Sequence, residues 1–281
     1  MKAYLDCYPC FFSQALKTAR MITADEKKIH SILVEVSRVL PTLSFEATPP
    51  EIGKEVYRII SDMTGVDDPY RHLKESCTRQ ALSLYPELKR LIESSEDRIL
   101  SALKVAIAGN IIDFGANAEF DIKRDIDIIL SQDLAIDHSE ALCRALDEAQ
   151  NVLYVADNAG ETVFDKLFIE EIGKRIVYVV REKPVINDAV HRDALAAGID
   201  RVAEIISSGT DAPGTILSLC SEEFLDVYRS SDLIISKGQG NYEGLSEEAR
   251  PIYFLLKAKC PVIARDIGVE MGSIVVMKAR G

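Results

Sequence analysis

The chain has 281 residues, of which 47% are hydrophobic and 28% charged, a composition that excludes a largely disordered protein and fits one large domain or two modest ones. Its net charge of −12 and its pI of about 4.9 argue against nucleic acid or an anionic membrane as a partner, because both repel an acidic surface. The N-terminus lacks the apolar core of a signal peptide, and no apolar run approaches the roughly 20 residues of a membrane span, so we expect a cytoplasmic protein with mainly reduced cysteines.

The first 145 residues are predicted to be mainly helical. Thr23 and Thr48 each precede a glutamate by three residues, the spacing of a capping box, and Pro49 suits the first helical position after the second threonine. Apolar residues recur at helical spacing after both threonines. The predicted helices lie after Thr23, after Thr48, from Asp68 to a point before Pro86, from Ser95 to Gly109 and over 137–149.

From residue 150 the pattern changes to short apolar runs of strand length, separated by amphipathic stretches of helical length. The predicted strands are 152–156, 176–180, 202–206, 233–235, 261–264 and 273–277. The predicted helices between them are 162–172, 188–197, 214–229 and 246–258. Continuous apolar strands that alternate with helices indicate a mainly parallel sheet covered on both faces. We therefore predict an α/β fold, with a helical region over 1–145 packed on a three-layer αβα domain over 146–281.

Polar residues follow four of the predicted strands. The carboxyl ends of parallel strands meet at one edge of a sheet, which is where ligands bind in open α/β folds. The polar segments are Asp157–Glu161, Arg181–Asp188, Ser207–Thr215 and Ser236–Glu243. Together they predict a single site at this edge.

Asp157-Asn158 and Asn187-Asp188 offer carboxylate and amide oxygens, which suit Mg²⁺ or Mn²⁺ better than soft metals. In the alternative interpretation, the two aspartates only cap the helices that follow them. Gly160 and Glu161 weaken that alternative for Asp157, because the next helix is expected to start after them.

Gly209 to Thr215 reads as a glycine- and hydroxyl-bearing turn that enters a helix, whose free backbone amides would bind an anion. An ordinary strand-to-helix turn is the alternative. Lys237 stands beside Gly238 and Gly240, which would let the backbone approach a ligand closely; a plain surface lysine is the alternative here. The spacing matches neither a dinucleotide fingerprint nor a P-loop.

Two further polar patterns lie in the helical region. Asn110 and Asp113 share one face of an apolar helical run, so they either face the site or end the helix in a solvated turn. Cys7 and Cys10 form a CxxC that could bind a soft metal or act as a redox pair, and they could equally be small hydrophobic residues. Cys77 and His72 could complete a set of metal ligands with that pair.

Taken together and in this order, the motifs resemble the damage-control phosphatase family, in its mainly prokaryotic branch with an N-terminal cysteine pair. The motifs are D-C-x-P-C-x-x-x-Q at 6–14, A-G-N-x-I-D at 108–113, D-N-A-G-E at 157–161, N-D at 187–188, G-T-D-A-P-G-T at 209–215 and K-G-Q-G-N-x-E at 237–243. The resemblance implies a helical region packed on an α/β domain, and a divalent metal bound by Asp157, Asn158 and Asp188. It also implies hydrolysis of phosphomonoesters of sugars and cofactor-like metabolites, with no single substrate for the family.

The predicted function is therefore metal-dependent hydrolysis of small phosphorylated metabolites such as sugar phosphates, with Mn²⁺, Mg²⁺, Co²⁺ or Ni²⁺ as the cofactor. The nucleophile is either water or the Asp157 carboxylate. The other predicted catalytic residues are Asn110, Asp113 and Glu161. The predicted substrate-binding residues are Gly209, Thr210, Asp211, Thr215, Lys237, Asn241 and Glu243. The alternatives are a sensor that binds a phosphorylated metabolite without turnover, and a transferase on the same scaffold.

Overall fold

The computed structural model describes residues 1–111 and 133–279, in which seven strands form one sheet of order β1-β7-β6-β5-β2-β3-β4. The strands are β1 (Ile136–Asp137), β2 (Asn151–Val155), β3 (Arg175–Val180), β4 (Glu204–Ser207), β5 (Leu233–Lys237), β6 (Ile252–Lys257) and β7 (Ile274–Lys278). All neighbouring strands are parallel except β6 and β7. The predicted α/β fold with a mainly parallel sheet is confirmed. No helix in the described ranges is long and apolar enough to span a membrane.

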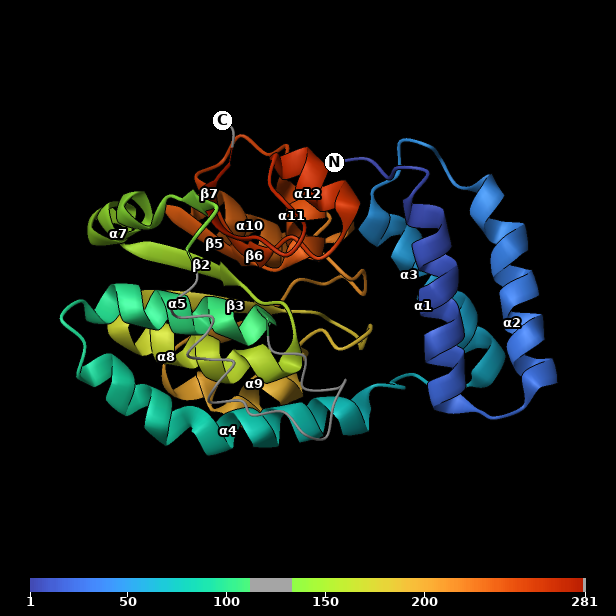
Figure 1. Ribbon diagram of the computed structural model, residues 1–281, viewed down its shortest axis with the longest axis horizontal. Helices are drawn as coiled ribbons and strands as arrows, with labels where there is room; N and C mark the ends of the chain where they lie inside the picture. The colour runs from blue at the N-terminus through green and yellow to red at the C-terminus, as the bar shows by residue number, and fades with distance from the viewer. Residues whose placement is uncertain (112–132, 280–281) are drawn as a thin grey trace.

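Helices cover both faces of the sheet (Figure 1). Successive side chains of a strand point to opposite faces, so Val152 and Tyr154 of β2 enter one core while Leu153 and Val155 enter the other. The first core is closed by α4 (Arg71–Glu93), α5 (Arg98–Ile111), α7 (Ser139–Glu148), α8 (Thr162–Ile172) and α9 (His191–Ala197). The second is closed by α10 (Glu222–Ser230), α11 (Gln239–Leu245) and α12 (Pro261–Ile267).

Three N-terminal helices form a bundle with a core of its own at one end of the molecule (Figure 1). They are α1 (Cys7–Ile22), α2 (Glu26–Val39) and α3 (Pro49–Thr64). The capping box at Thr48 is present, with Pro49 at the start of α3. The one predicted at Thr23 is not: Asp25 caps α2 by accepting hydrogen bonds from two backbone amides. The domain boundary near residue 145 stays a prediction, and α4 and α5 pack with the sheet.

Two predicted elements are wrong. The stretch 246–258, predicted as a helix, contains β6, and 261–264, predicted as a strand, is the start of α12. The apolar run 252–256 of β6 is buried on both faces, and together with the mainly polar residues 246–250 before it the segment has a length that also fits a helix. Pro261 at the first helical position and Gly268 in a left-handed conformation after the last one are the usual signals of a short helix.

Two predicted helix ends also differ from the structure. α4 continues through Pro86, because Ala81 and Leu88 anchor it to the core on either side while Pro86 itself is exposed, so water can reach the carbonyl that the proline leaves unbonded. α10 begins only at Glu222, several residues after the predicted start at 214.

The strand order places a crevice at the carboxyl ends of β2 and β5. The chain runs outward from β2 through β3 to β4, then crosses back to add β5 on the other side of β2. Helices on opposite faces diverge at such a switch point, which is the usual place for a ligand. Asp157 follows β2 there, and Gly238 follows β5.

Candidate active site

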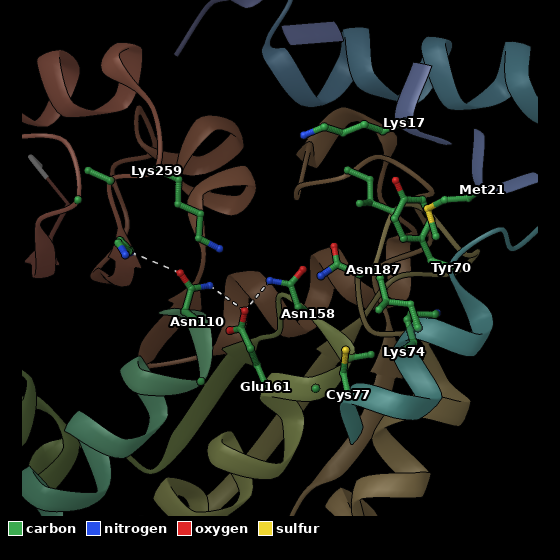
Figure 2. A pocket seen from close by; sticks show the side chains of 18 of the residues that line it. Lys17, Met21, Tyr70, Lys74, Cys77, Asn110, Asn158, Glu161, Asn187 and Lys259 are labelled. Atoms are coloured by element: carbon green, nitrogen blue, oxygen red, sulfur yellow. Dashed lines mark hydrogen bonds between the residues drawn. The ribbon is translucent and has the colours of Figure 1, made fainter. Parts of the chain in front are cut away.

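A cavity of about 800 Å³ lies at the carboxyl ends of the strands, with walls from α1, α4, α5 and the loops after β2, β3 and β6. Asn110, Asn158 and Glu161 line one part of it, and Figure 2 shows these three side chains turned toward one another. Asn187 also lines the cavity. The crevice predicted from the strand order therefore contains a metabolite-sized space.

Two amide groups join two carboxylates at the base of this cavity. The Asn110 Nδ2 donates to Asp157 Oδ2 at 2.9 Å and to Glu161 Oε1 at 2.8 Å. The Asn158 Nδ2 donates to Asp157 Oδ2 at 3.0 Å and also to Glu161 Oε1. The structure thus brings together Asn110 from the helical region with the residues after β2. Asp113, the other polar residue of its motif, lies outside the described residues.

Gly238 makes room for the Asp157 carboxylate. A Cβ atom on Gly238 would lie 1.9 Å from Asp157 Oδ2, closer than two non-bonded atoms can approach. Gly238 also has a φ of +80°, which side chains rarely tolerate. This glycine is therefore needed for the position of Asp157, and it holds the end of β5 against the loop after β2.

Asp188 is held beside Asp157 and Asn158 by the backbone. Asn158 and Asp188 form an antiparallel bridge, and the amide of Ala189 donates to the carbonyl of Asp157 at 2.8 Å. The preceding Ile186 has a φ of +44°, which costs free energy for a β-branched residue and is typical of functional loops. The three predicted metal ligands therefore come from two loops that are bonded to each other.

The carboxylates of Asp157, Glu161 and Asp188 have too few positive charges near them to balance their own. Burial raises the pKa of Asp157 well above its usual range, and the charges of Glu161 and Asp188 raise it further. Burial also raises the pKa of Asp188, although the guanidinium of Arg181, whose Nε donates to Asp188 Oδ2 at 2.8 Å, opposes the shift. Such a cluster favours either a proton or a bound cation.

Lys237 is buried behind this cluster and does not line the cavity, in contrast to its predicted substrate-binding role. Its ammonium group donates to the carbonyl of Ala106 at 2.9 Å, to Asp165 Oδ1 at 2.6 Å and to Glu161 Oε2 at 3.3 Å, which uses all three protons. Burial lowers the pKa of Lys237, but the two carboxylates outweigh it and the net shift is upward. The structure places Lys237 as a support for Glu161.

The loop Gly209–Thr215 does not form the predicted anion site. No α-helix begins at its end, since only a short 3-10 turn at Leu217–Leu219 follows and α10 starts at Glu222, and none of its residues lines the 800 Å³ cavity. Its glycine packs against the loop after β5 instead: a Cβ on Gly214 would lie 2.4 Å from the carbonyl oxygen of Gly240. The glycines of both loops thus allow the loops to approach each other.

The side chains of these two loops are satisfied within the protein. Thr215 and Asn241 are buried and bonded to each other at 2.8 Å, and Arg181 donates to both. Thr210 is buried as well, while Asp211 pairs with Lys54 at 2.9 Å beside a second cavity of about 390 Å³. Their predicted contact with the substrate is not seen in the main cavity.

Glu243 is also turned away from the cavity. Its Oε1 accepts from Gln239 at 2.9 Å, and burial raises the pKa of Glu243 to about 7. Cys7 lies near Glu243. Burial raises the pKa of the Cys7 thiol, and the charge of Glu243 raises it further. The predicted contact of Glu243 with the substrate is therefore not seen in the main cavity.

No three His, Cys, Asp or Glu side chains are gathered around a metal-sized space within 1–111 and 133–279. The predicted divalent site has only two such residues, because its third ligand is an asparagine. The larger soft-metal set, with Cys77 and His72 added to Cys7 and Cys10, is not formed. None of the six cysteines, all of which lie in the described ranges, forms a disulfide, and Cys10 is exposed.

Several cavity residues were not predicted. Lys257 and Lys259 line it from the end of β6, and they were missed because that strand was assigned as a helix. Lys17 of α1 also lines the cavity, and nothing in the sequence around Lys17 indicates this position. Arg181 directly follows β3, and its position after a buried strand could have indicated its role.

Residues 3–275 match the family model described as the damage-control phosphatase ARMT1-like domain. The chain is 34% identical to a damage-control phosphatase of Pyrococcus horikoshii, with 99% of this chain and 98% of the relative covered. It is 33% identical to a damage-control phosphatase of Archaeoglobus fulgidus, with 96% of each chain covered. A crystal structure of a DUF89 family protein from P. horikoshii has a TM-score of 0.93 and 33% identity, over 100% of both chains.

Proposed function

We propose a function from the premise that this chain belongs to the damage-control phosphatase ARMT1-like domain family. Relatives named damage-control phosphatases support a phosphatase role. We infer that the chain hydrolyses phosphomonoesters of small metabolites, sugar phosphates among them, and that it needs a divalent metal ion held by Asp157, Asn158 and Asp188. The observation that carries the proposal is a cluster of buried carboxylates with too little positive charge around it. Asp157 and Asp188 do not line the metabolite-sized cavity themselves, but Asp157 is bonded to Asn110 and Asn158, which do.

The residues fit a hard divalent cation. The Asn158 amide turns its nitrogen toward Asp157 and Glu161, which leaves its oxygen as the free acceptor, and Figure 2 shows that oxygen directed into the cavity. Two carboxylates and one amide oxygen leave coordination positions for water and substrate, as Mg²⁺ and Mn²⁺ sites commonly do. A divalent ion bound there would supply positive charge where negative charge builds up on the phosphoryl oxygens.

The remaining roles follow from the contacts of the chain's own residues. Lys259 faces the same part of the cavity, and its charge lowers the pKa of Asp157, so we propose that it binds a phosphoryl oxygen. Both oxygens of Glu161 already accept hydrogen bonds, so we assign it to holding Asn110 and Asn158 in position. In the chemical step, either water attacks phosphorus directly, or the Asp157 carboxylate attacks and water then hydrolyses the aspartyl phosphate; in both cases the P–O bond to the alcohol breaks, the alcohol leaves and phosphate is released.

Hydrolysis of p-nitrophenyl phosphate with Mg²⁺, Mn²⁺, Co²⁺ or Ni²⁺, before and after treatment with EDTA, tests the proposal. We expect activity that EDTA removes and added metal restores, and a loss on the order of 10³-fold in Asp157→Asn. Asp200→Asn, an equal change of charge at an exposed site away from the cavity, is the control and should keep its activity. Full activity in EDTA would contradict the metal requirement, and binding without turnover for any metal would show a sensor.

The identity of the nucleophile needs a separate experiment. Acid quenching during turnover of a ³²P-labelled ester traps an aspartyl phosphate if the Asp157 carboxylate attacks. Label that stays on the wild-type protein and is absent from Asp157→Asn assigns the carboxylate as the nucleophile. Absence of labelled protein throughout the burst phase assigns water.

A further inference from the structure

We propose that the substrate carries a second anionic group besides the phosphoryl group that is removed, and that Lys17 of α1 binds this second group. The inference rests on the proposed phosphatase function and narrows its substrate class to phosphomonoesters of an acidic alcohol. It assigns a specificity role to the N-terminal bundle, which otherwise contributes nothing to the carboxylate cluster.

The cavity is lined by several lysines that have no carboxylate partner in the described residues. Its four lysines are Lys17, Lys74, Lys257 and Lys259. Only Lys74 is paired, through an ion pair of 2.8 Å with Asp193. The other three ammonium groups make no ion pair with any residue of the described ranges, on a chain whose net charge is −12. Because an acidic protein offers many carboxylates, three unpaired lysines around one cavity indicate an anionic ligand.

The three unpaired lysines fall into two groups by position. Lys257 and Lys259 come from the end of β6, on the side of Asn110, whose Oδ1 accepts from the backbone amide of Lys257 at 3.4 Å. Lys17 comes from α1 and faces them across the cavity, as Figure 2 shows for Lys17 and Lys259. One phosphoryl group near Asn158 therefore cannot account for all three.

A count of charges separates Lys17 from the rest. The buried carboxylates around the base are Asp157, Glu161, Asp165 and Asp188. Two buried cations, Arg181 and Lys237, and one divalent ion would balance these four negative charges. Lys257 and Lys259 then match the two negative charges of a phosphoryl group. Lys17 is left over: it is exposed and lines the cavity without an ion-pair partner in the described ranges, so it is free to bind one further negative charge on the substrate.

The size and walls of the cavity agree with a substrate that reaches Lys17. A volume of about 800 Å³ is several times what a phosphoryl group needs and is in the range of sites that enclose whole metabolites. Met21 of α1 and Met271, before β7, line it with exposed thioethers, and Tyr70 and Leu73 of the loop and helix after α3 add apolar surface. The middle of the substrate can lie against these side chains while its two charged ends reach opposite walls.

The experiment compares esters that differ only in the second anionic group. The pairs are glycerol 3-phosphate against 3-phosphoglycerate, which adds a carboxylate, and a hexose monophosphate against a hexose bisphosphate, which adds a phosphate. We expect KM to be about tenfold lower for the member that carries the second anionic group in at least one pair, and the pair that responds identifies the group. Lys17→Ala should abolish this difference at unchanged kcat, and Lys17→Arg should restore it.

Arg20→Ala is the matched control, because it removes one positive charge from the same helix at a position outside both cavities. It should leave every KM as it was. The inference is overturned if the wild-type protein hydrolyses both members of both pairs with equal KM, or if Lys17→Ala raises KM for all esters alike; the phosphatase proposal survives either result. If no ester is hydrolysed with any metal, the phosphatase proposal fails, and this inference with it.

Discussion

The loops after β2 and β3 and the loops after β4 and β5 are both rich in polar residues but have different surroundings. Asn158, after β2, lines the cavity, and Asp157 lies behind it, bonded to Asn158 in a cluster that lacks positive charge. Thr215 and Asn241, in the other pair of loops, bond to each other and to Arg181 and are closed off from the cavity. Both pairs carry glycines, amides and hydroxyl or acidic groups.

The difference shows what separates a binding loop from a supporting one. In the supporting loops, each polar side chain finds its partner inside the protein and each glycine admits another loop. In the binding loops, the carboxylates repel one another and one amide oxygen stays free. A polar, glycine-rich loop at the end of a strand is therefore a site only where its groups are left without enough partners.

Outside the proposed metal ligands, Gly238→Ala should give the largest loss of activity, because it disturbs the contact between the two pairs of loops. The new Cβ would displace the Asp157 carboxylate, and a misplacement of about 1 Å can cost a hundredfold in kcat. Gly173→Ala is the control, since it shares a positive φ but has open space around the Cβ. Steady-state assays on both variants test this; wild-type kcat in Gly238→Ala would show that Asp157 is not where activity arises.

Lys237→Met should cause the largest loss of stability. It leaves the buried carboxylates of Asp165 and Glu161 without their cation, which typically costs about 3–5 kcal/mol. Urea unfolding near neutral pH measures the change, with the exposed Lys27→Met as the reference. A change below about 1 kcal/mol with a raised KM would mean that Lys237 reaches the substrate after all.

Thr215→Val tests whether the loop after β4 is only a support. The substitution keeps the shape and removes the hydroxyl that bonds to Arg181 and Asn241, so we expect the free energy of unfolding to fall by about 1–2 kcal/mol. KM for p-nitrophenyl phosphate should stay the same. A several-fold rise in KM at unchanged stability would restore the anion-binding interpretation of Gly209–Thr215.

Glu243→Gln should give the most pH-dependent effect on stability. The pKa of Glu243 is raised from 4.5 to about 7 in the folded chain, so the folded state keeps a proton that the unfolded state has lost between these values. Stability therefore falls as pH rises through this window, by at most about 3 kcal/mol. The variant should match the wild type near pH 4 and be more stable near pH 8. Equal stability of the two proteins at both values would contradict the buried, protonated state.

The sequence was sufficient to predict the centre of the sheet and the base of the cavity. β2, β3 and β5 lie close to their predicted positions, and Asn110, Asp157 and Asn158 are brought together as expected. Two local signals made this prediction possible. One is an isolated amide in an apolar helix, and the other is an acidic and an amide residue directly after a buried strand. The order of elements fixed which ends of the strands meet.

The rest depends on tertiary partners that local sequence does not encode. Lys237 could be either an exposed ligand or a buried ion-pair partner, and only the position of Asp165 on α8 decides this. Lys17 reaches the cavity through the placement of the N-terminal bundle. β6 was missed because its apolar run was joined to the mainly polar residues 246–250 before it, and the combined stretch has the length of a helix. Pro251, directly before the strand, is the local signal that separates the two.

Calorimetric titration of the metal-free protein with Mn²⁺ tests the central claim most directly. The account predicts that each wild-type chain binds one ion at the cluster, that Asp157→Asn and Asp188→Asn lose this binding, and that Asp200→Asn keeps it. Equal binding by all four proteins would place the ion elsewhere, and no binding by the wild type would contradict the proposed metal-dependent mechanism.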